Sequence, residues 1–476
     1  MVKAIEVKAL NFSYSGTKDK ILSDVNFELE YGSVTLLSGL SGEGKSTLIS
    51  IVTGIIPNLV SGNLEGEVWV DGVNIKGKKL GQVCRRVGVV LQNADHQIIH
   101  KNVEDEIAFG CENFAVPSNI IKEQIDRVCT IMDLDKFKQT RTLSGGQKQR
   151  LITASTLATG QKIIILDEPL ANLDVESAIL LMDSLKQLAR AGYAILVAEH
   201  RLDLVFPYVD AIWNICQGKV NKIEDKQKYL LSQTLKITDG EKPYEGGKCL
   251  LQLEHIQYEV KHQKILKDIN LEIFEKERLL ILGENGSGKT TLLRILARLN
   301  KPTGGHMSQY LDSSFRRGYS GKKWFKSVGV IYQNPNYQLF MPTVEQEISF
   351  NAVSKAYANE IIELFHLEPL RKRHPQSLSE GQKRKVSIAA VVAGNPKVLL
   401  LDEPTVGQDY QGLWELVKIL NALHKKNGNT MITITHDMRC AEALCDRAVI
   451  LANGKVEEQG GKNLIQKFFD DLRRKA

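Results

Sequence analysis

The stretch Gly39-Leu40-Ser41-Gly42-Glu43-Gly44-Lys45-Ser46 decides the fold of this chain. It matches the pattern G-x-x-x-x-G-K-[ST], in which glycines allow successive backbone N–H groups to surround a phosphate. The apolar run 34–37 before it predicts a strand, and residues 47–52 after it predict a helix whose N-terminus favours an anion. We therefore expect Lys45 to contact the β- and γ-phosphates of a nucleotide and Ser46 to ligate Mg²⁺.

The same pattern returns 244 residues later as Gly283-Glu284-Asn285-Gly286-Ser287-Gly288-Lys289-Thr290, again between an apolar run and a helical pattern. Other stretches recur in the same order at nearly the same offset: 90–93 with 331–334, 102–109 with 343–350, 143–147 with 378–382, and 165–169 with 400–404. Such ordered repetition indicates an internal duplication in which both halves share one fold.

Residues 239–248 are polar and rich in turn formers, which is typical of a linker. We expect a first domain at 1–235, a linker at 236–247 and a second domain at 248–476. Within each half, short apolar segments alternate with longer helical patterns, which predicts an α/β fold with a mainly parallel sheet. Some early segments, such as 25–29, alternate apolar and polar residues and predict an additional antiparallel β layer.

The composition is that of an ordinary globular protein, with 43% hydrophobic and 25% charged residues in a chain of 476. Its seven cysteines include no C-x-x-C pair, which argues for reduced thiols and against a zinc site or iron–sulfur cluster. The net charge of +6 does not by itself indicate nucleic-acid binding. No apolar run approaches the ~18 residues that span a bilayer, so we expect any membrane role to be played from outside it.

Acidic residues follow a second pair of apolar runs. Asp167 and Asp402 end these runs, so we expect their carboxylates at the carboxyl edge of a parallel sheet, holding the Mg²⁺ shell. Glu168 and Glu403 come one residue later and are candidates for the general base that polarises the attacking water. The alternative for each Asp-Glu pair is a solvated loop.

One further motif resembles that of a known family. Leu143-Ser144-Gly145-Gly146-Gln147 and Leu378-Ser379-Glu380-Gly381-Gln382 resemble the signature of ATP-binding-cassette (ABC) proteins, and the resemblance covers nearly the whole chain twice. It implies two P-loop domains of the ABC type, each with a helical subdomain, that sandwich two ATP molecules head to tail. The ATP held by Lys45 would then face the second signature, and the ATP held by Lys289 would face the first.

The resemblance also implies roles for single residues. His200 and His436 would sense the γ-phosphate, Gln92 and Gln333 would touch Mg²⁺ and water, and Tyr14 and Tyr258 would stack on adenine. For the tyrosines, ordinary core packing is the alternative. The residues expected to bind ATP are Tyr14, Gly39, Leu40, Ser41, Gly42, Glu43, Gly44, Lys45, Ser46, Thr47 and Gln92 in the first half, and Tyr258, Gly283, Glu284, Asn285, Gly286, Ser287, Gly288, Lys289, Thr290, Thr291 and Gln333 in the second. The expected Mg²⁺ ligands are Ser46, Gln92, Asp167, Thr290, Gln333 and Asp402.

Glu380 departs from the repeat, because Gly145 stands at its place in the first half. A carboxylate near the polyphosphate would slow ATP hydrolysis at the site built from Lys45 and Ser379; the alternative is a side chain turned outward.

The residues after each glutamine suggest what hydrolysis drives. Segments 93–99 and 334–340 each place a polar stretch before a hydrophobic pair, at the surface where cassettes receive a transmembrane partner. With 54–62 and 66–72 they look most like the ATPases of energy-coupling-factor importers, which serve vitamins or metal ions. That resemblance implies a peripheral protein at the cytoplasmic face of the membrane, working with separate coupling and substrate-capture subunits. The alternative is a soluble double-cassette ATPase acting on ribosomes or nucleic acid.

Two remaining segments carry expectations about structure alone. Residues 300–326 are basic and lack a clear hairpin pattern, so we expect a solvated surface loop there, with contact to lipid headgroups as the alternative. Residues 462–476 place apolar pairs among charges at helical spacing, which predicts a terminal helix packed on its own domain.

Overall fold

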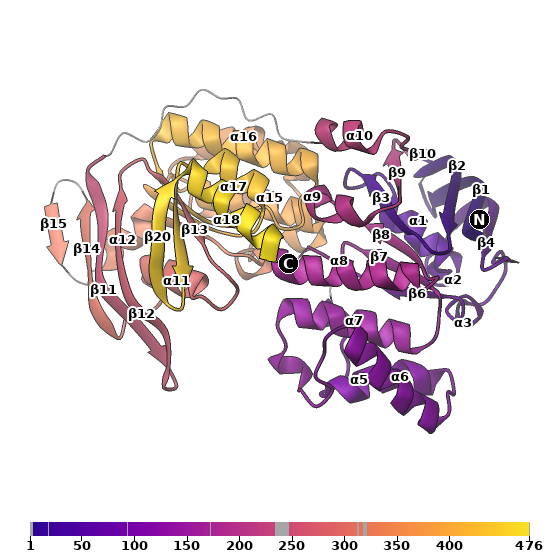
Figure 1. Ribbon diagram of the computed structural model, residues 1–476. Coiled ribbons are helices and arrows are strands. Elements are labelled where there is room, and N and C mark those ends of the chain that lie inside the picture. Colours follow the sequence, from indigo (N-terminus) through magenta and orange to yellow (C-terminus); the bar gives the residue numbers. More distant parts are fainter. Residues whose placement is uncertain are drawn as a thin grey trace. The chain divides into compact units, whose positions relative to one another are not determined.

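The computed structural model describes residues 3–17, 19–92, 94–171, 173–233, 247–311, 314–317 and 321–475 (Figure 1). The chain divides into two compact units, Met1–Thr234 and Leu235–Lys475. The predicted linker, residues 236–247, lies outside the described residues except for its last position.

The first unit contains an antiparallel and a mainly parallel sheet. The antiparallel sheet has the strand order β2-β1-β4-β5. Its strands are β1 (Lys3–Tyr14), β2 (Leu22–Glu30), β4 (Gly62–Val70) and β5 (Val73–Asn74). The other sheet has the order β10-β9-β3-β8-β7-β6, and only the β9–β10 pair is antiparallel. Its strands are β3 (Val34–Gly39), β6 (Val87–Val90), β7 (Ile163–Asp167), β8 (Ala194–Ala198), β9 (Ala211–Cys216) and β10 (Lys219–Lys222). Both predicted β layers are therefore present.

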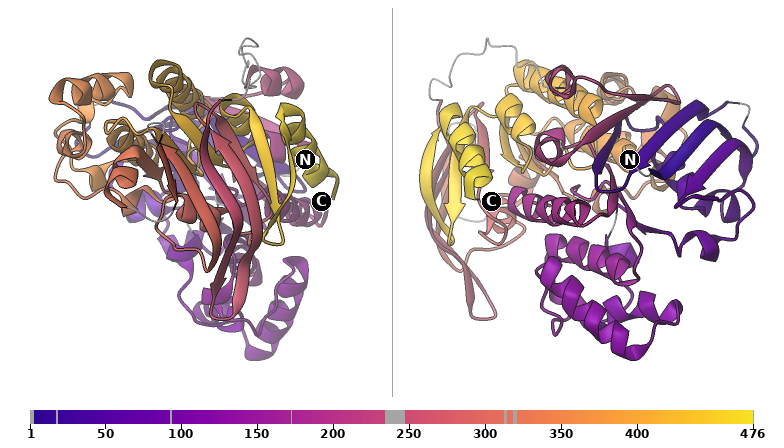
Figure 2. Two further views of the ribbon diagram at one scale, coloured as in Figure 1. Left: turned by 90° about the vertical axis from the view of Figure 1, so that its left-hand side faces the viewer. Right: turned by 45° about the vertical axis from the view of Figure 1, so that its right-hand side comes forward.

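Helices cover the parallel sheet of the first unit and also form a group of their own. The helices are α1 (Lys45–Val52), α2 (Ile55–Asn58), α3 (Leu80–Val83), α4 (Ala94–Gln97), α5 (Val103–Asn113), α6 (Ser118–Ile131), α7 (Gly145–Ala158), α8 (Val175–Arg190), α9 (Leu202–Val205) and α10 (Lys226–Ser232). Helices α5, α6 and α7 pack on one another and lie at the bottom of the unit in Figures 1 and 2. They form the helical subdomain that the resemblance implies.

The second unit repeats this plan, with its strands joined into one sheet. The strand order is β15-β14-β11-β12-β20-β19-β13-β18-β17-β16, and a single residue pair, Asp268 with Lys455, connects β12 to β20. The strands are β11 (Cys249–Val260), β12 (Gln263–Phe274), β13 (Arg278–Leu282), β14 (Gly304–Leu311), β15 (Ser314–Arg317), β16 (Val328–Ile331), β17 (Val398–Asp402), β18 (Thr430–Ile434), β19 (Arg447–Ala452) and β20 (Lys455–Gly461).

The helices of the second unit follow the same order as those of the first. They are α11 (Lys289–Leu296), α12 (Gly321–Ser327), α13 (Val344–Phe350), α14 (Lys355–Leu364), α15 (Glu380–Val392), α16 (Tyr410–Asn427), α17 (Met438–Leu444) and α18 (Lys462–Lys475). Helix α18 contacts α17, β19 and β20 and buries Leu464, Ile465 and Phe469. This confirms the terminal helix predicted from the spacing of apolar residues.

The expectation of a solvated loop at residues 300–326 is wrong. Strand β14 pairs with β11, extending the antiparallel part of the sheet, and β15 pairs with β14. Helix α12 follows and places Trp324 in the core, where the indole Nε1 donates to the carbonyl of Leu296 at 3.2 Å. The Arg298 guanidinium lies 5.1 Å from the indole ring centroid. Many basic residues in a segment therefore did not exclude a strand that buries Met307 and a helix that buries Trp324.

Because Trp324 is fully buried, we expect Trp324→Ala to lower the free energy of unfolding of the second unit by about 3–5 kcal/mol. The neighbouring Phe325 is 54% exposed, so Phe325→Ala is the matched control, with an expected change within about 0.5 kcal/mol. Urea unfolding of both variants measures the difference. Equal shifts would show that α12 does not anchor this segment.

Candidate nucleotide and catalytic sites

Each phosphate loop follows a buried strand and leads into a helix. In the first unit β3 leads into α1, and in the second β13 leads into α11. The residue before each helix, Gly44 or Gly288, has a φ of 107° or 102°, which an L side chain rarely adopts. The two loops therefore have matching backbone turns, of the kind that directs N–H groups toward a bound phosphate.

Both loop lysines are buried and bound to their own loop. Lys45 Nζ donates hydrogen bonds to the carbonyl oxygens of Gly39 at 2.8 Å and Leu40 at 3.0 Å. Lys289 makes the corresponding pair of bonds at 2.6 and 2.9 Å. These bonds hold each ammonium group at the loop, where the β- and γ-phosphates of a nucleotide bind.

The other predicted loop residues divide by exposure. The exposed ones are Ser41, Gly42, Ser46, Glu284, Asn285, Gly286 and Thr290. The buried or half-buried ones are Glu43, Thr47, Gly283, Ser287 and Thr291. The carboxylate of Glu43 accepts a hydrogen bond from the backbone N–H of Gln217, so it is turned toward the end of β9.

The carboxylates predicted to hold metal and activate water lie where buried strands end. Strand β7 ends at Asp167 and β17 ends at Asp402, and every residue of both strands is buried. The next residue, Glu168 or Glu403, has a φ of 48° or 50°, a region that residues other than glycine rarely occupy. Backbone strain of this kind clusters at functional sites, where surrounding contacts maintain it.

The surroundings of these aspartates fit a magnesium ion. Burial raises the pKa of Asp167 to about 6, against the opposing effect of a hydrogen bond with Ser46. Burial also raises the pKa of Asp402, against the charge of Lys289 and a hydrogen bond with Thr290. The buried Oδ1 of Asp167 has no hydrogen-bond partner among the described residues. A carboxylate beside a hydroxyl suits Mg²⁺, which takes few protein ligands and completes its shell with phosphate and water oxygens.

In the first unit the candidate general base contacts both predicted sensor residues. Glu168 Oε1 lies 3.3 Å from His200 Nε2, and Glu168 Oε2 accepts a hydrogen bond from Gln92 Nε2 at 2.6 Å. Gln92 and His200 therefore meet at one carboxylate.

The second unit brings together a different set. Glu403 Oε1 lies 3.6 Å from His436 Nε2, and Glu403 Oε2 accepts the backbone N–H of His436 at 3.2 Å. The side chain of Gln333 has no hydrogen-bond partner among the described residues. The carboxylate and the histidine thus meet in both units, whereas the glutamine reaches the carboxylate only in the first.

Each signature stretch forms the N-terminus of a helix. Ser144 caps α7 and Ser379 caps α15; each hydroxyl accepts the backbone N–H of the glutamine three residues later at 3.3 Å. Gln147 and Gln382 return a bond to the backbone N–H of their serine at 3.1 and 3.2 Å. This reciprocal cap fixes the serine at a helix N-terminus, a position that favours an anion.

The glycines of the signature differ between the units at one position. Gly145 and Gly146 lie in the first turn of α7, and Glu380 and Gly381 lie in the first turn of α15. The Glu380 side chain is exposed and pairs with Lys383 at 3.0 Å. This pairing is along its own helix and supports the outward orientation.

Tyr14 and Tyr258, which were expected to play the same role, do not occupy equivalent places in the two units. Phe12 pairs with Leu22 in the first unit, and Tyr258 pairs with Leu266 in the second. The β11–β12 hairpin is shorter than its counterpart, so Tyr258 occupies the place of Phe12. The hydroxyl groups of Tyr14 and Thr47 form a hydrogen bond of 2.9 Å next to the phosphate loop. Tyr258 packs against the core of its unit.

Sequence reasoning missed three residues beside these sites. Glu199, immediately before His200, is buried and accepts the backbone N–H of Leu170 at 2.9 Å. Arg201 donates to the carbonyl oxygens of Leu170 at 3.2 Å and Leu173 at 2.6 Å. Their positions on either side of the histidine were the available signal. A carboxylate buried after a strand is costly unless several donors bind it, so such a residue is a candidate for a specific structural role.

The third missed residue is Arg384, on the signature helix of the second unit. It is buried, and it donates to the backbone carbonyls of Tyr332 at 2.7 Å and of Gln333. Burial lowers its pKa to about 10, against the opposing effect of the Glu403 charge, so the side chain remains cationic at neutral pH. The neutral Gln149 stands at the corresponding position of the first signature stretch, so the repeat itself did not draw attention to Arg384.

Comparison with known proteins bears on the identity of these sites. The sequence profile of the ABC transporter family matches residues 22–171 and 266–406. A protein of Methanosarcina mazei, provisionally named an ABC transporter ATP-binding protein, is 30% identical over 521 residues, which cover 95% of this chain and 88% of that protein. A protein of Bacillus subtilis, provisionally named the HMP/thiamine import ATP-binding protein YkoD, is 32% identical over 492 residues, covering 94% and 89%.

Solved structures agree on the fold. The RNase-L inhibitor superposes with a TM-score of 0.69 at 20% identity, over 97% of this chain and 92% of that chain. The archaeal ribosome recycling factor ABCE1, in complex with the ribosomal stalk protein aP1, gives 0.68 at 21% identity, over 95% and 90%. At these identities the likeness shows the fold alone. The family match in both halves and the relatives along the whole chain confirm the predicted resemblance: the chain belongs to the ABC transporter family and is an ATPase with two cassettes.

Proposed function

We propose that this chain is the ATP-hydrolysing subunit of a membrane importer of the energy-coupling-factor type, for a vitamin or metal-ion substrate. It would act at the cytoplasmic face of the membrane through separate transmembrane coupling and substrate-capture subunits. No helix within the described residues has the length and apolar character needed to cross a bilayer. The relative from Bacillus subtilis, whose name refers to thiamine import, supports the substrate class.

The observation that carries this proposal is the exposure of apolar side chains after each sensor glutamine. We name residues 94–99 and 334–340 the docking segments. Ile99 is 67% exposed in the first, and Tyr337 and Phe340 are 69% and 74% exposed in the second. Tyr337 and Phe340 lie within one seven-residue segment, and large apolar side chains that gather on a surface are typical of a protein–protein interface. Ile99 is the exposed apolar side chain at the corresponding place in the first unit.

Both docking segments are held in place by a buried glutamate. Glu106 Oε2 accepts the backbone N–H groups of Ile99 at 2.8 Å and His100 at 2.7 Å. Glu347 Oε2 accepts the corresponding groups of Phe340 and Met341, each at 2.7 Å. These bonds fix the exposed side chains without a partner, which reduces the conformational entropy lost when one binds.

Each docking segment also lies next to the signature helix of its own unit. Lys148 on α7 pairs with Asp95 at 2.6 Å, and Arg384 on α15 binds the backbone just before the second docking segment. Movement of a partner seated on a docking segment would therefore act on a signature helix. This contact provides a physical route between the membrane subunit and ATP.

For hydrolysis, we propose that the two units close on two ATP molecules. Lys45 would bind the phosphates of one ATP, opposite Ser379, and Lys289 those of the other, opposite Ser144. Mg²⁺, when bound by Ser46 and Asp167 or by Thr290 and Asp402, would neutralise charge on the phosphates. Glu168 and Glu403 would each take a proton from the attacking water, and the neighbouring histidine would orient the carboxylate.

Replacing Ile99 and Phe340 with aspartate tests the docking segments. We expect Ile99→Asp with Phe340→Asp to reduce recovery of multi-span membrane proteins with the tagged chain from detergent-solubilised membranes by at least about tenfold, because a charge enters an apolar interface. Basal ATP hydrolysis by the purified chain should stay within about twofold, since neither side chain reaches the nucleotide.

Phe137→Asp is the matched control, because Phe137 is 78% exposed but lies outside both docking segments. It should leave recovery of membrane proteins unchanged. Equal losses in the control and the docking variants, or co-sedimentation of the wild-type chain with ribosomes in place of membranes, would refute the importer proposal.

Single replacements of the two glutamates test the inequality of the sites. We expect Glu403→Gln to remove more than half of the ATP turnover and Glu168→Gln to remove less than half, because the Glu380 carboxylate would add negative charge near the phosphates of the site that uses Glu168, even while it pairs with Lys383. The double variant should lose about 100-fold or more of the rate. Steady-state phosphate release measures all three. Equal losses from the single variants would show that Glu380, which points along its own helix, has no effect on rate.

A further inference from the structure

The residue before the sensor histidine differs between the two units. It is Glu199 in the first and Thr435 in the second, and both side chains are only 2% exposed. A buried carboxylate is costly unless several donors satisfy it, so its presence next to a catalytic site requires an explanation. The contacts of Glu199 supply one.

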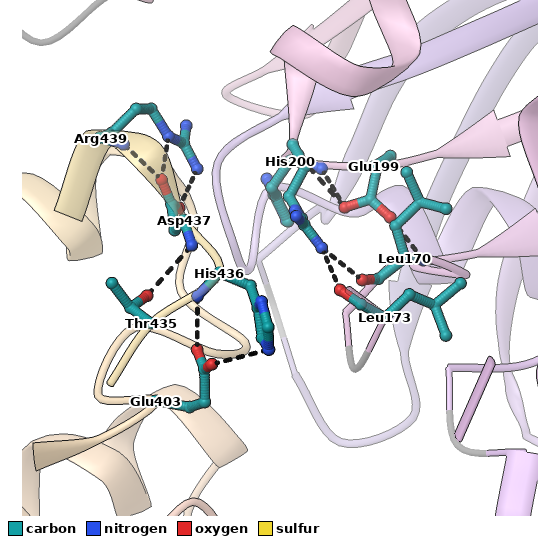
Figure 3. Close-up of polar contacts among 10 residues, drawn as sticks. Leu170, Leu173, Glu199, His200, Glu403, Thr435, His436, Asp437 and Arg439 are labelled. Atoms are coloured by element: carbon teal, nitrogen blue, oxygen red, sulfur yellow. Dashed lines mark hydrogen bonds and ion pairs between the residues drawn. The ribbon is translucent and has the colours of Figure 1, made fainter. Parts of the chain in front are cut away.

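Glu199 binds two backbone segments that lie near the proposed catalytic glutamate: residues 200–201 and residue 170. Its Oε1 accepts the N–H groups of His200 at 2.7 Å and Arg201 at 3.2 Å, and its Oε2 accepts the N–H of Leu170 at 2.9 Å (Figure 3). Arg201 in turn donates to the carbonyl oxygens of Leu170 and Leu173. The histidine loop is thereby fastened to residues 170–173, the segment that follows Glu168.

The second unit has Thr435 at this position, and there Glu403 itself accepts the backbone N–H of the histidine. Thr435 Oγ1 accepts the N–H of Asp437 at 3.1 Å. The backbone N–H of His436 instead donates to Glu403 Oε2, and Figure 3 shows the Glu403 carboxylate in contact with both the backbone and the ring of His436. One oxygen of Glu403 therefore accepts the backbone N–H of His436, and the other lies 3.6 Å from the ring of the same residue.

In the first unit Glu199 satisfies the corresponding N–H of His200, so Glu168 does not need to. One oxygen of Glu168 faces the His200 ring, and the other accepts the side chain of Gln92 at 2.6 Å. Gln92 lies two residues before the first docking segment. The first unit thus connects its docking segment directly to the catalytic carboxylate, and the second does not.

We propose that Glu199 is a positioning residue that binds the His200 backbone in place of Glu168, and so makes hydrolysis in the first unit depend on Gln92. This inference rests on the proposed role of Glu168 as general base. It implies that a partner on the first docking segment regulates hydrolysis through Gln92. The second docking segment would act through Arg384 and the signature helix.

The test isolates the first unit by working in a Glu403→Gln background. There, Glu199→Thr installs the residue of the second unit. We expect kcat to fall by about tenfold, as for a lost hydrogen bond to a charged group, with the KM for ATP within about twofold. Gln92→Ala should also lower kcat, and the Glu199→Thr/Gln92→Ala double variant should be no slower than the slower single variant, because both act through one contact.

Two further variants exclude a structural explanation. Glu199→Gln keeps one acceptor oxygen, which can bind the backbone N–H of His200 or that of Leu170 but not both, so it should recover part of kcat. This variant also provides the test if Glu199→Thr does not fold. Thr435→Val, in a Glu168→Gln background, is the matched control and should change kcat by less than about twofold, because Thr435 does not touch Glu403.

Additive effects of Glu199→Thr and Gln92→Ala, or a raised KM with unchanged kcat, would overturn the inference. The assay uses the purified chain without membrane subunits, so failure of the importer proposal would leave its outcome unaffected. Full turnover in the Glu168→Gln/Glu403→Gln variant would instead overturn the assignment of the general base.

Discussion

Adjacent parallel strands that end at one edge of a sheet are the constraint on which both sites depend. In the first unit β3, β8 and β7 are consecutive neighbours, all parallel and almost entirely buried. Their carboxyl ends must therefore come out side by side, and the residues that follow them are Lys45, His200 and Glu168. Strands β13, β18 and β17 repeat this arrangement in the second unit. Residues far apart in sequence are thus gathered without a dedicated binding domain.

The same edge also maintains the strained backbone of Glu168 and Glu403, the proposed general bases. The N–H of Glu168 donates to the carbonyl of Ala198 at 2.8 Å, and the N–H of Glu403 donates to that of Ile434 at 2.9 Å. Each acceptor is the last residue of the neighbouring parallel strand, so the ladder continues one residue beyond the strand that carries the glutamate. This bond offsets part of the cost of a positive φ and directs the carboxylate toward the histidine that follows the neighbouring strand.

Local patterns in the sequence were sufficient for the fold and for the residues whose place is set by strand ends. The phosphate loops and the Asp-Glu pairs come directly after apolar runs, so their places at strand ends could be predicted. The signature stretches were identified through the family resemblance, and the helix caps that they form were not predicted. Tyr258 was wrongly expected to act like Tyr14, because strand pairing sets the length of each hairpin and the two hairpins differ in length. Trp324 was missed because its burial depends on contacts with α11. Glu199 binds backbone N–H groups and Arg384 binds backbone carbonyl groups, and such backbone partners cannot be identified from side-chain patterns in a sequence.

Duplication explains why the two catalytic sites share a backbone yet differ in their contacts. Each histidine loop must satisfy the N–H of its histidine, and the nearest acceptor decides which one does so. Where Glu199 is present, the carboxylate of Glu168 accepts a hydrogen bond from Gln92 instead of from the histidine backbone. Where Thr435 is present, its hydroxyl binds the N–H of Asp437, and the carboxylate of Glu403 accepts the backbone N–H of His436. A single buried side chain can therefore change which loop controls a catalytic group while leaving every strand and helix in place. The two cassettes need no difference in fold to respond to different signals.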